Sequence, residues 1–584
     1  MKSFLKIVLA TFVAIILTCV FLFFIALGIV GGIAASSSDE TSVKPNSVFA
    51  LELNGEIIER SEDNPFESLL GLYSEQTQEM GLNDILSAIK KAKTNENIKG
   101  IYLEAGNLMA APASLREIRQ ALADFKTSGK FIYAYGALYS QGSYYVASVA
   151  DKVFLNPEGM VNWHGVAVEN TFYKGTFDKL GVEMQVVRVG TYKSAVEPFI
   201  ATKMSDANRE QVTAFAGSIW NTVVADVASS RKIAPEQLNQ LADQGITFKP
   251  ATELVKGRLV DSLLYDDGIQ TYIKNKIGIK EKTDLSIVKL EAMKNAASDE
   301  KMSENKIAVV YAYGEIDGTS PDGISSDETV KTLAKVRKDD KIKAVVFRVN
   351  SPGGSALGSE LIWREVNLMK TKKPIFVSMG DYAASGGYYI SAPADMIIAQ
   401  PNTLTGSIGV FGMFPNISGL ASKIGISFDG VQTNKYSDLP KVNRAMNPEE
   451  KGLLQAYVNH TYETFVGHCA QGRKMTPDAI KKIAEGRVWT GEQAKKLGLV
   501  DALGNLNDAI SLIAKKAHLA TYNVVEYPKQ KSFIEKFMSS LDAKMQERVQ
   551  KAQLGEYYSY LKQIRAISSL QGVQALMPLN ITVK

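Results

Sequence analysis

The sequence predicts a protein of two tandem α/β repeats behind one hydrophobic N-terminal segment. Residues 98–166 align without a gap to residues 342–410, at a constant offset of 244 positions. In both copies short β-rich runs alternate with helical patterns, which is typical of α/β domains. A chain of 584 residues is also longer than a single hydrophobic core normally sustains. We therefore expect each copy to fold as one unit.

The N-terminal segment, residues 1–36, is predicted to be an uncleaved transmembrane anchor. Residues 7–33 carry no charged side chain, and as a helix they are about 40 Å long, enough to cross a hydrocarbon core about 30 Å thick. Lys2 and Lys6 precede this run, so the N-terminus is expected in the cytoplasm and the body outside it. The alternative, a cleavable signal peptide, typically has a shorter apolar core of about 7–15 residues.

The two repeats are predicted over residues 47–290 and 305–525, and their elements follow the same order. Helical patterns at residues 115–125 and 357–369 follow the second expected strand of each copy. Residues 526–584 are predicted to form a helical extension, because large apolar side chains there recur at helical spacing. The expected strands cover residues 48–55, 100–103 and 131–134 in the first repeat and residues 307–314, 344–347 and 375–378 in the second.

Composition excludes some classes of function. The net charge of +4 comes from 66 basic and 62 acidic residues without a block of one sign, so we expect no nucleic-acid partner. The two cysteines, Cys19 and Cys469, give no disulfide framework. No histidine lies at a recognised ligand spacing, so the sequence predicts neither a metal site nor a cofactor. The histidines are His164, His460, His468 and His518.

The repeats differ where a nucleophile would stand. Ser385 falls opposite Gln141, and the pair Gly353-Gly354 falls opposite Met109-Ala110. A serine in a tight turn is usually structural, but two distant features lost together indicate a copy that has given up its chemistry. Ser385 is therefore the candidate nucleophile. The backbone N–H groups of Gly354 and Gly386 are the candidate donors to an oxyanion, because glycine lets the backbone approach a substrate closely.

A serine hydroxyl needs a base, and no histidine lies in a matching motif. A buried lysine serves in that role when its amine is neutral near pH 7. Two lysines stand at nearly equivalent positions of the repeats, Lys193 in residues 189–195 and Lys435 in residues 433–437. An arbitrary lysine is a surface cation, so these patterns leave the choice between the two open.

Taken together, these motifs resemble the signal peptide peptidase A (protease IV) family in its long, membrane-anchored, tandem-repeat form. The matching stretches are residues 190–199, 350–354, 384–389 and 405–409. The resemblance implies a Clp/crotonase-like fold in both repeats and a serine protease with a serine-lysine dyad. It implies Ser385 as nucleophile, Lys193 as general base, and Ser407 as the residue that holds the lysine amine.

Two further positions follow from this resemblance. Trp163 stands at the first-repeat position equivalent to Ser407, which agrees with a first repeat that lacks a nucleophile. Lys435 lies near the place where shorter, single-repeat members keep their base. On this basis it is a relic, a substitute base or an ordinary lysine.

The implied substrates are signal-peptide remnants and unfolded apolar peptides, cut at the bacterial inner membrane by a periplasmic catalytic body. The implied assembly is a closed homo-oligomer, a tetramer. Three alternatives stand beside this function: a general envelope quality-control peptidase, a catalytically silent membrane scaffold, and a crotonase-like coenzyme A-binding protein. The intact set of Ser385, Lys193, Ser407 and Gly354 argues against the last two.

Overall fold

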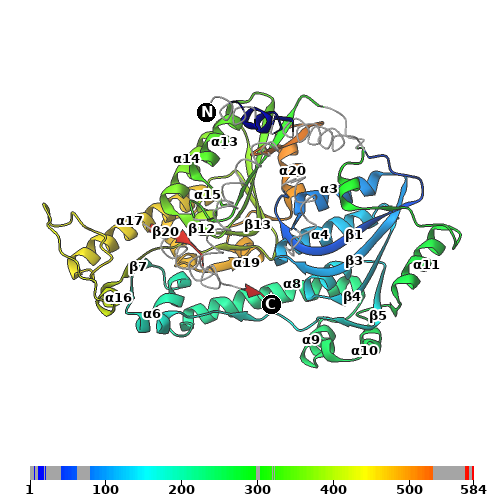
Figure 1. Cartoon of the computed structure of the whole chain (residues 1–584), viewed down its shortest axis with the longest axis horizontal. Coiled ribbons are helices and arrows are strands. Elements are labelled where there is room, and N and C mark those ends of the chain that lie inside the picture. The colour runs from blue at the N-terminus through cyan, green and yellow to red at the C-terminus, as the bar shows by residue number, and fades with distance from the viewer. Residues whose placement is uncertain are drawn as a thin grey trace.

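The computed structural model describes both predicted repeats (Figure 1). Within the described part of the chain, no helix is long and apolar enough to cross a membrane. Most of the predicted anchor at residues 1–36 lies outside that part. The described residues are 6, 11–18, 20–21, 41–61, 79–297, 303–318, 320, 323–529, 573–577 and 582–583.

The first repeat is built on a parallel sheet with the strand order β2-β1-β3-β4-β5-β8. The strand β9 pairs with the start of β1, on the edge opposite β3 where β2 pairs with its end. Helices cover both faces, as a parallel sheet requires, so alternate residues of one strand enter different cores. Phe49 packs toward one face and Val48 toward the other. The strands are β1 (Ser47–Ile58), β2 (Glu79–Gly81), β3 (Ile98–Met109), β4 (Phe131–Tyr139), β5 (Lys152–Val161), β8 (Ser262–Leu263) and β9 (Ile287–Val288).

The second repeat has the corresponding sheet, ordered β17-β15-β13-β11-β10-β19, with β14 between β13 and β18. Its strands β10, β11 and β13 stand where β1, β3 and β4 stand in the first repeat. The prediction of two tandem α/β repeats is therefore confirmed. The strands are β10 (Lys306–Tyr313), β11 (Ile342–Ser351), β13 (Ile375–Ala384), β14 (Met396–Ala399), β15 (Leu404–Gly406), β17 (Val488–Thr490), β18 (Ala502–Leu503) and β19 (Asn523–Tyr527).

The helices repeat as the strands do. The pairs α4/α14, α5/α15, α8/α17, α9/α18, α10/α19 and α11/α20 take the same places in their repeats. In the first repeat the helices are α3 (Leu82–Thr94), α4 (Pro112–Lys126), α5 (Gln141–Ala147), α6 (Lys174–Leu180), α7 (Glu197–Ile200), α8 (Asp206–Arg231), α9 (Pro235–Asp243), α10 (Ala251–Lys256), α11 (Asp266–Ile277) and α12 (Leu290–Lys294). In the second they are α13 (Ser326–Lys338), α14 (Ala356–Lys370), α15 (Gly386–Ser391), α16 (Ser418–Lys423), α17 (Pro448–Arg473), α18 (Pro477–Ile483), α19 (Gly491–Lys496) and α20 (Leu506–Lys516).

One segment of the first repeat reaches across to the second, and we call residues 174–200 the docked arm. It contains α6, β7 (Glu183–Val189), a 3₁₀ turn and α7. The strand β7 pairs antiparallel with β16 (Val410–Asn416) of the second repeat over its whole length. The arm leads into α8, which runs across the lower part of Figure 1, with α9 and α10 drawn below it. A lysine of the first repeat is thereby carried into the second.

Buried charges also join the repeats. Arg348 on β11 donates to both carboxylate oxygens of Glu59, at 3.0 and 3.1 Å, and lies 2.8 Å from Glu117. Nearby, the backbone N–H and hydroxyl of Ser114 donate to Asp381 at 2.8 and 2.6 Å. Removing one member of a buried ion pair leaves an uncompensated charge, which costs about 3–5 kcal/mol. These contacts therefore hold the repeats in one relative arrangement.

Most of the helical extension predicted over residues 526–584 lies outside the described part of the chain. Its described parts are strands: the end of β19, then β20 (Val573–Leu576) and β21 (Thr582–Val583). Residues 530–572 lie outside the described part. The strand β20 pairs with β12 (Gly353–Ser355) and with β16, so its backbone groups find partners on two open strand edges.

Candidate active site

Ser385 stands between the end of β13 and the first residue of α15. Its backbone has φ +57° and ψ −113°, a conformation that residues with a Cβ rarely adopt. The N–H of Ser385 donates to the carbonyl of Gly406 at 2.8 Å, which helps to hold the turn. Strain of this kind is retained where the surrounding structure over-determines it, and it clusters at functional sites. The turn presents the hydroxyl at the carboxyl end of a central parallel strand.

Lys193, from the docked arm, reaches this hydroxyl. Its Nζ lies 2.8 Å from Ser385 Oγ, 3.0 Å from Ser407 Oγ and 3.2 Å from the Ser407 carbonyl oxygen. All three side chains are fully buried. Burial lowers the pKa of the Lys193 amine well below its ordinary value, and desolvation is its sole cause. The structure therefore provides an amine that can be neutral and can accept the proton of Ser385.

A group of glycines faces the nucleophile. Gly353 and Gly354 have φ +108° and +149° and follow directly on β11. A Cβ added to Gly353 would stand 2.0 Å from the carbonyl oxygen of Ala575 and 2.8 Å from the backbone N of Gly386. One carbonyl oxygen thus lies against the backbone at Gly353 and Gly386, an approach that only glycine at residue 353 allows.

That oxygen belongs to β20, the strand between β12 and β16; we call the place that it fills between these two strand edges the cleft. Gly354 is in register with Ala575, and Phe411 of β16 is in register with Gln574. The N–H of Met577 donates to the carbonyl of Pro352 at 2.8 Å. The cleft therefore accepts an extended backbone by adding a strand to its two edges, a common way to bind peptides.

The equivalent place in the first repeat is closed by larger side chains. Gln141 stands where Ser385 stands, and its amide donates to the Gly165 carbonyl at 2.9 Å while accepting from the N–H groups of His164 and Gly165. Trp163 stands where Ser407 stands, is fully buried, and donates from its ring nitrogen to Leu238. At these two positions the first repeat thus has no hydroxyl.

Lys435, the other candidate base, lies apart from this site. Its side chain is 63% exposed and forms an ion pair with Glu449 at 2.5 Å. The hydrogen bond with Glu449 raises the pKa of Lys435, which favours its charged form. The structure brings Lys193, Ser385 and Ser407 together and leaves Lys435 on the surface as an ordinary ion-paired lysine.

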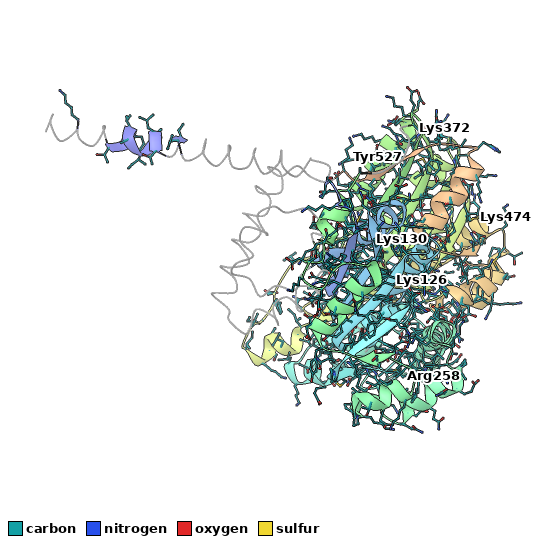
Figure 2. The ribbon with its side chains drawn as sticks, turned by 90° about the vertical axis from the view of Figure 1, so that its right-hand side faces the viewer. Lys126, Lys130, Arg258, Lys372, Lys474 and Tyr527 are labelled. Atoms are coloured by element: carbon teal, nitrogen blue, oxygen red, sulfur yellow. The ribbon has the colours of Figure 1, made fainter. Side chains whose placement is uncertain are left out.

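Other features of the described residues add no competing site. Two surface hollows lie on the first repeat, lined in part by Lys126, Lys130 and Arg258, which Figure 2 labels. Their charges are partly paired, since Lys126 contacts Asp151 at 2.8 Å. No dyad residue lines either hollow. Within the described ranges, no group of three or more His, Cys, Asp or Glu side chains could hold a metal ion.

The sequence motifs do not include the residues that surround Lys193. We call residues 190–194 the lysine loop. A turn of the second repeat, residues 485–488, and Gln211 of α8 both contact this loop. The repeat alignment contains one signal for the turn, because Gly245 and Gly486 occupy equivalent places. In the structure both have a positive φ, +63° and +73°. Gln211 has no comparable signal, because its contacts exist only once the repeats are folded together.

Comparison with known proteins places the chain in a family. The model of peptidase family S49 matches residues 124–280 and 367–520, one match in each repeat. Protease 4 of Salmonella typhi is 38% identical over 537 residues, covering 89% of this chain and 86% of that protein. Protease 4 of Haemophilus influenzae is 35% identical over 526 residues, covering 85% and 83%. The chloroplastic serine protease SPPA of Arabidopsis thaliana is 31% identical over 487 residues, covering 82% and 70%.

Among solved structures, a ClpP1 mutant from Listeria monocytogenes is 16% identical and covers 35% of this chain and 94% of its own. Its TM-score of 0.24 is too low to carry an argument about the fold. The sequence relatives, by contrast, extend over both repeats and most of the chain. The chain therefore belongs to peptidase family S49 and is a serine protease.

Proposed function

We propose that this protein is a membrane-anchored serine endopeptidase that uses Ser385 as nucleophile and Lys193 as general base. The observation that carries the proposal is the distance of 2.8 Å between Lys193 Nζ and Ser385 Oγ in a fully buried setting. A serine hydroxyl is a weak nucleophile until a neighbouring base takes its proton. Ser407 supports the same role, because its hydroxyl and carbonyl oxygens orient the amine toward Ser385.

The reaction follows from these contacts. Ser385 Oγ attacks the peptide carbonyl while its proton passes to Lys193, and the N–H groups of Gly354 and Gly386 stabilise the oxyanion. Lys193 then gives the proton to the leaving amine, and a water molecule activated by the same amine hydrolyses the acyl-enzyme. General base catalysis contributes about 10²–10⁴-fold, and each oxyanion donor contributes about 3–4 kcal/mol of transition-state stabilisation.

The proposed substrates are unfolded apolar peptides, above all signal-peptide remnants. Support comes from the way β20 lies in the cleft, because a folded segment cannot add a strand between β12 and β16. The cleft is apolar on its β16 side, where Phe411 and Met413 pack with Leu576 of β20. The same cleft suits a broader envelope quality-control peptidase, which differs only in its substrates.

The proposed setting is the bacterial inner membrane, with residues 1–36 as the anchor and the catalytic body in the periplasm. The proposed assembly is a homo-oligomer, a tetramer. It is supported by exposed apolar side chains in the segment after α16, which are unusual for a surface that stays in water. They are Ile424, Ile426, Phe428 and Val431.

Turnover of a fluorogenic apolar peptide by the full-length protein in detergent tests the mechanism. Ser385→Ala is expected to lower kcat by about 10⁴-fold or more, since removing the nucleophile removes the covalent route. Unchanged turnover in Ser385→Ala, together with binding of a coenzyme A thioester, would assign the site to the rival coenzyme A class. Circular dichroism of the variant ensures that the loss is chemical.

A further inference from the structure

A turn of the second repeat touches both the base and the residue that orients it. The carbonyl of Glu485 accepts from the N–H of Tyr192 at 2.8 Å, next to Lys193 in the chain. In the same turn Gly486 N donates to the Ile408 carbonyl at 2.8 Å, and the Arg487 carbonyl accepts from Ser407 N at 2.7 Å. Three consecutive residues thus hold the lysine loop on one side and the Ser407 segment on the other.

Gly486 packs directly on Lys193. A Cβ added to Gly486 would stand 2.7 Å from Lys193 Cβ and 2.8 Å from its Cα and N. These are backbone atoms and the first carbon of the side chain, which cannot move aside as the end of a flexible side chain does. The φ of Gly486 is +73°, so this turn needs glycine for its conformation as well as for its closeness to the lysine.

Gln211 of α8 also holds the lysine loop. It is 1% exposed on α8, and its Nε2 donates to the Tyr192 carbonyl at 3.0 Å and to Ser194 Oγ at 3.0 Å. Its Oε1 accepts from Val488 N at 3.1 Å. One amide therefore binds the residues on both sides of Lys193 and ties them to the end of the same turn.

The first repeat has a glycine at the equivalent position, in a turn without a lysine beside it. Gly245 has φ +63°, and the nearest atom to an added Cβ is Phe248 Cδ2 at 3.8 Å. Two residues later, Thr247 Oγ1 accepts from Trp163 N at 2.9 Å, in the place where the Arg487 carbonyl accepts from Ser407 N. The two turns differ in conformation, since Glu485 has φ +53° where Gln244 has φ −81°, and only the glycine of the second repeat packs on Lys193.

We propose that Gly486 and Gln211 are positioning residues for the base: they fix Lys193 of the first repeat against Ser385 and Ser407 of the second. The inference rests on the proposed function. A lysine side chain has many rotamers, and Lys193 comes to this site on an arm from another repeat. The covalent geometry of the side chain therefore does not determine where its amine lies, and neighbouring residues must do so. A misplacement of about 1 Å costs about 10²-fold in rate.

Gly486→Ala tests this, with Gly245→Ala as its matched control. Both substitutions place a Cβ at a positive φ, but only the first meets Lys193. We expect Gly486→Ala to lower kcat by about 10²-fold with KM within twofold, and Gly245→Ala to lower kcat less than threefold. We also expect the acid limb of the kcat profile of Gly486→Ala to move to higher pH, because a displaced amine is better solvated and its pKa rises.

Gln211→Ala provides a second measurement that does not depend on a strained backbone. Its kcat is expected to fall by about tenfold with the same direction of shift in the acid limb, and thermal unfolding of both variants shows whether they are folded. Wild-type kcat and an unmoved acid limb in Gln211→Ala and in folded Gly486→Ala would overturn the positioning role. Equal losses in Gly486→Ala and Gly245→Ala would do the same. If Ser385→Ala retains activity, the failure belongs to the proposed function instead.

Discussion

Each repeat contains an arm at the same position in its sequence, but the two arms lie in different surroundings. The docked arm, residues 174–200, pairs its strand β7 with β16 and carries Lys193 into a fully buried site. The corresponding segment of the second repeat, residues 418–447, which we call the free arm, carries Lys435 and extends from the left end of Figure 1. Val187 of the docked arm is 1% exposed, whereas Val431, 244 positions later, is 97% exposed.

The difference lies in the partner strand. The docked arm finds β16 of the second repeat in the same chain, whereas among the described residues no strand pairs with the free arm. The residues equivalent to β7, 427–433, consequently form no strand. The two lysines differ because one is buried against a neighbouring repeat: burial lowers the pKa of Lys193, whereas the hydrogen bond with Glu449 raises the pKa of Lys435. Only the buried lysine meets the requirement of the proposed base.

Replacing the docked lysine is the strongest way to test this comparison. Lys193→Ala is expected to lower kcat by about 10²–10⁴-fold, because the Ser385 hydroxyl loses its base. Steady-state turnover of an apolar peptide measures the effect. Near-normal turnover in Lys193→Ala would show that some other group deprotonates the serine.

The pH profile should follow the buried amine. Only the neutral form of Lys193 accepts a proton, so kcat/KM rises with pH and reaches a plateau above the pKa of the amine. Because burial lowers that pKa, the midpoint is expected well below 10.4, the ordinary value for lysine. Below the midpoint the rate falls about tenfold per pH unit. A midpoint at the ordinary value would mean that the amine is solvated during turnover.

Undocking the arm should have a smaller effect than removing its lysine. Val187→Asp places a carboxylate in a buried position, which costs on the order of 3 kcal/mol or more, and we expect about a tenfold or greater loss of turnover and a lower Tm. Val431→Asp, at the equivalent exposed position, is the matched control and should leave both unchanged. It is expected instead to reduce the size of the assembly in light scattering, if the free arm joins copies of the chain.

Removing the strand that fills the cleft should have a modest effect. Deletion of residues 573–584 is expected to raise kcat/KM for an added peptide by about threefold to tenfold, because an occupied site lowers apparent affinity by the fraction that is free. Initial rates at low substrate measure this. A fall in kcat/KM would indicate that β20 completes the cleft rather than competing for it.

The smallest effect is expected at the free lysine. Lys435→Ala removes an exposed ion pair with Glu449, and such pairs contribute about 0–1 kcal/mol. Turnover should stay within twofold of the wild type and Tm within about 1 °C. A large loss of turnover in Lys435→Ala alone would show that the free arm takes part in catalysis, and would contradict the contrast drawn between the two arms.

Much of the fold could be predicted from the sequence because the signals are local. The strands expected at residues 48–55, 344–347 and 375–378 lie within β1, β11 and β13. The alignment of the two repeats places Ser385 opposite Gln141 from the sequence alone. The tail was harder to predict: residues 573–576 form a strand between β12 and β16, and no local sequence pattern identifies those partner strands.

The sequence by itself determined that two α/β repeats follow one another, that one has a serine and a glycine pair where the other has none, and that two lysines are candidates for the base. The tertiary structure brings Lys193, and not Lys435, beside Ser385. Their local sequences are alike, but the pKa of an amine depends on its burial, and burial depends on which arm finds a partner strand. The residues around Lys193, such as Gln211 and Gly486, come from distant parts of the chain, so only folding brings them together.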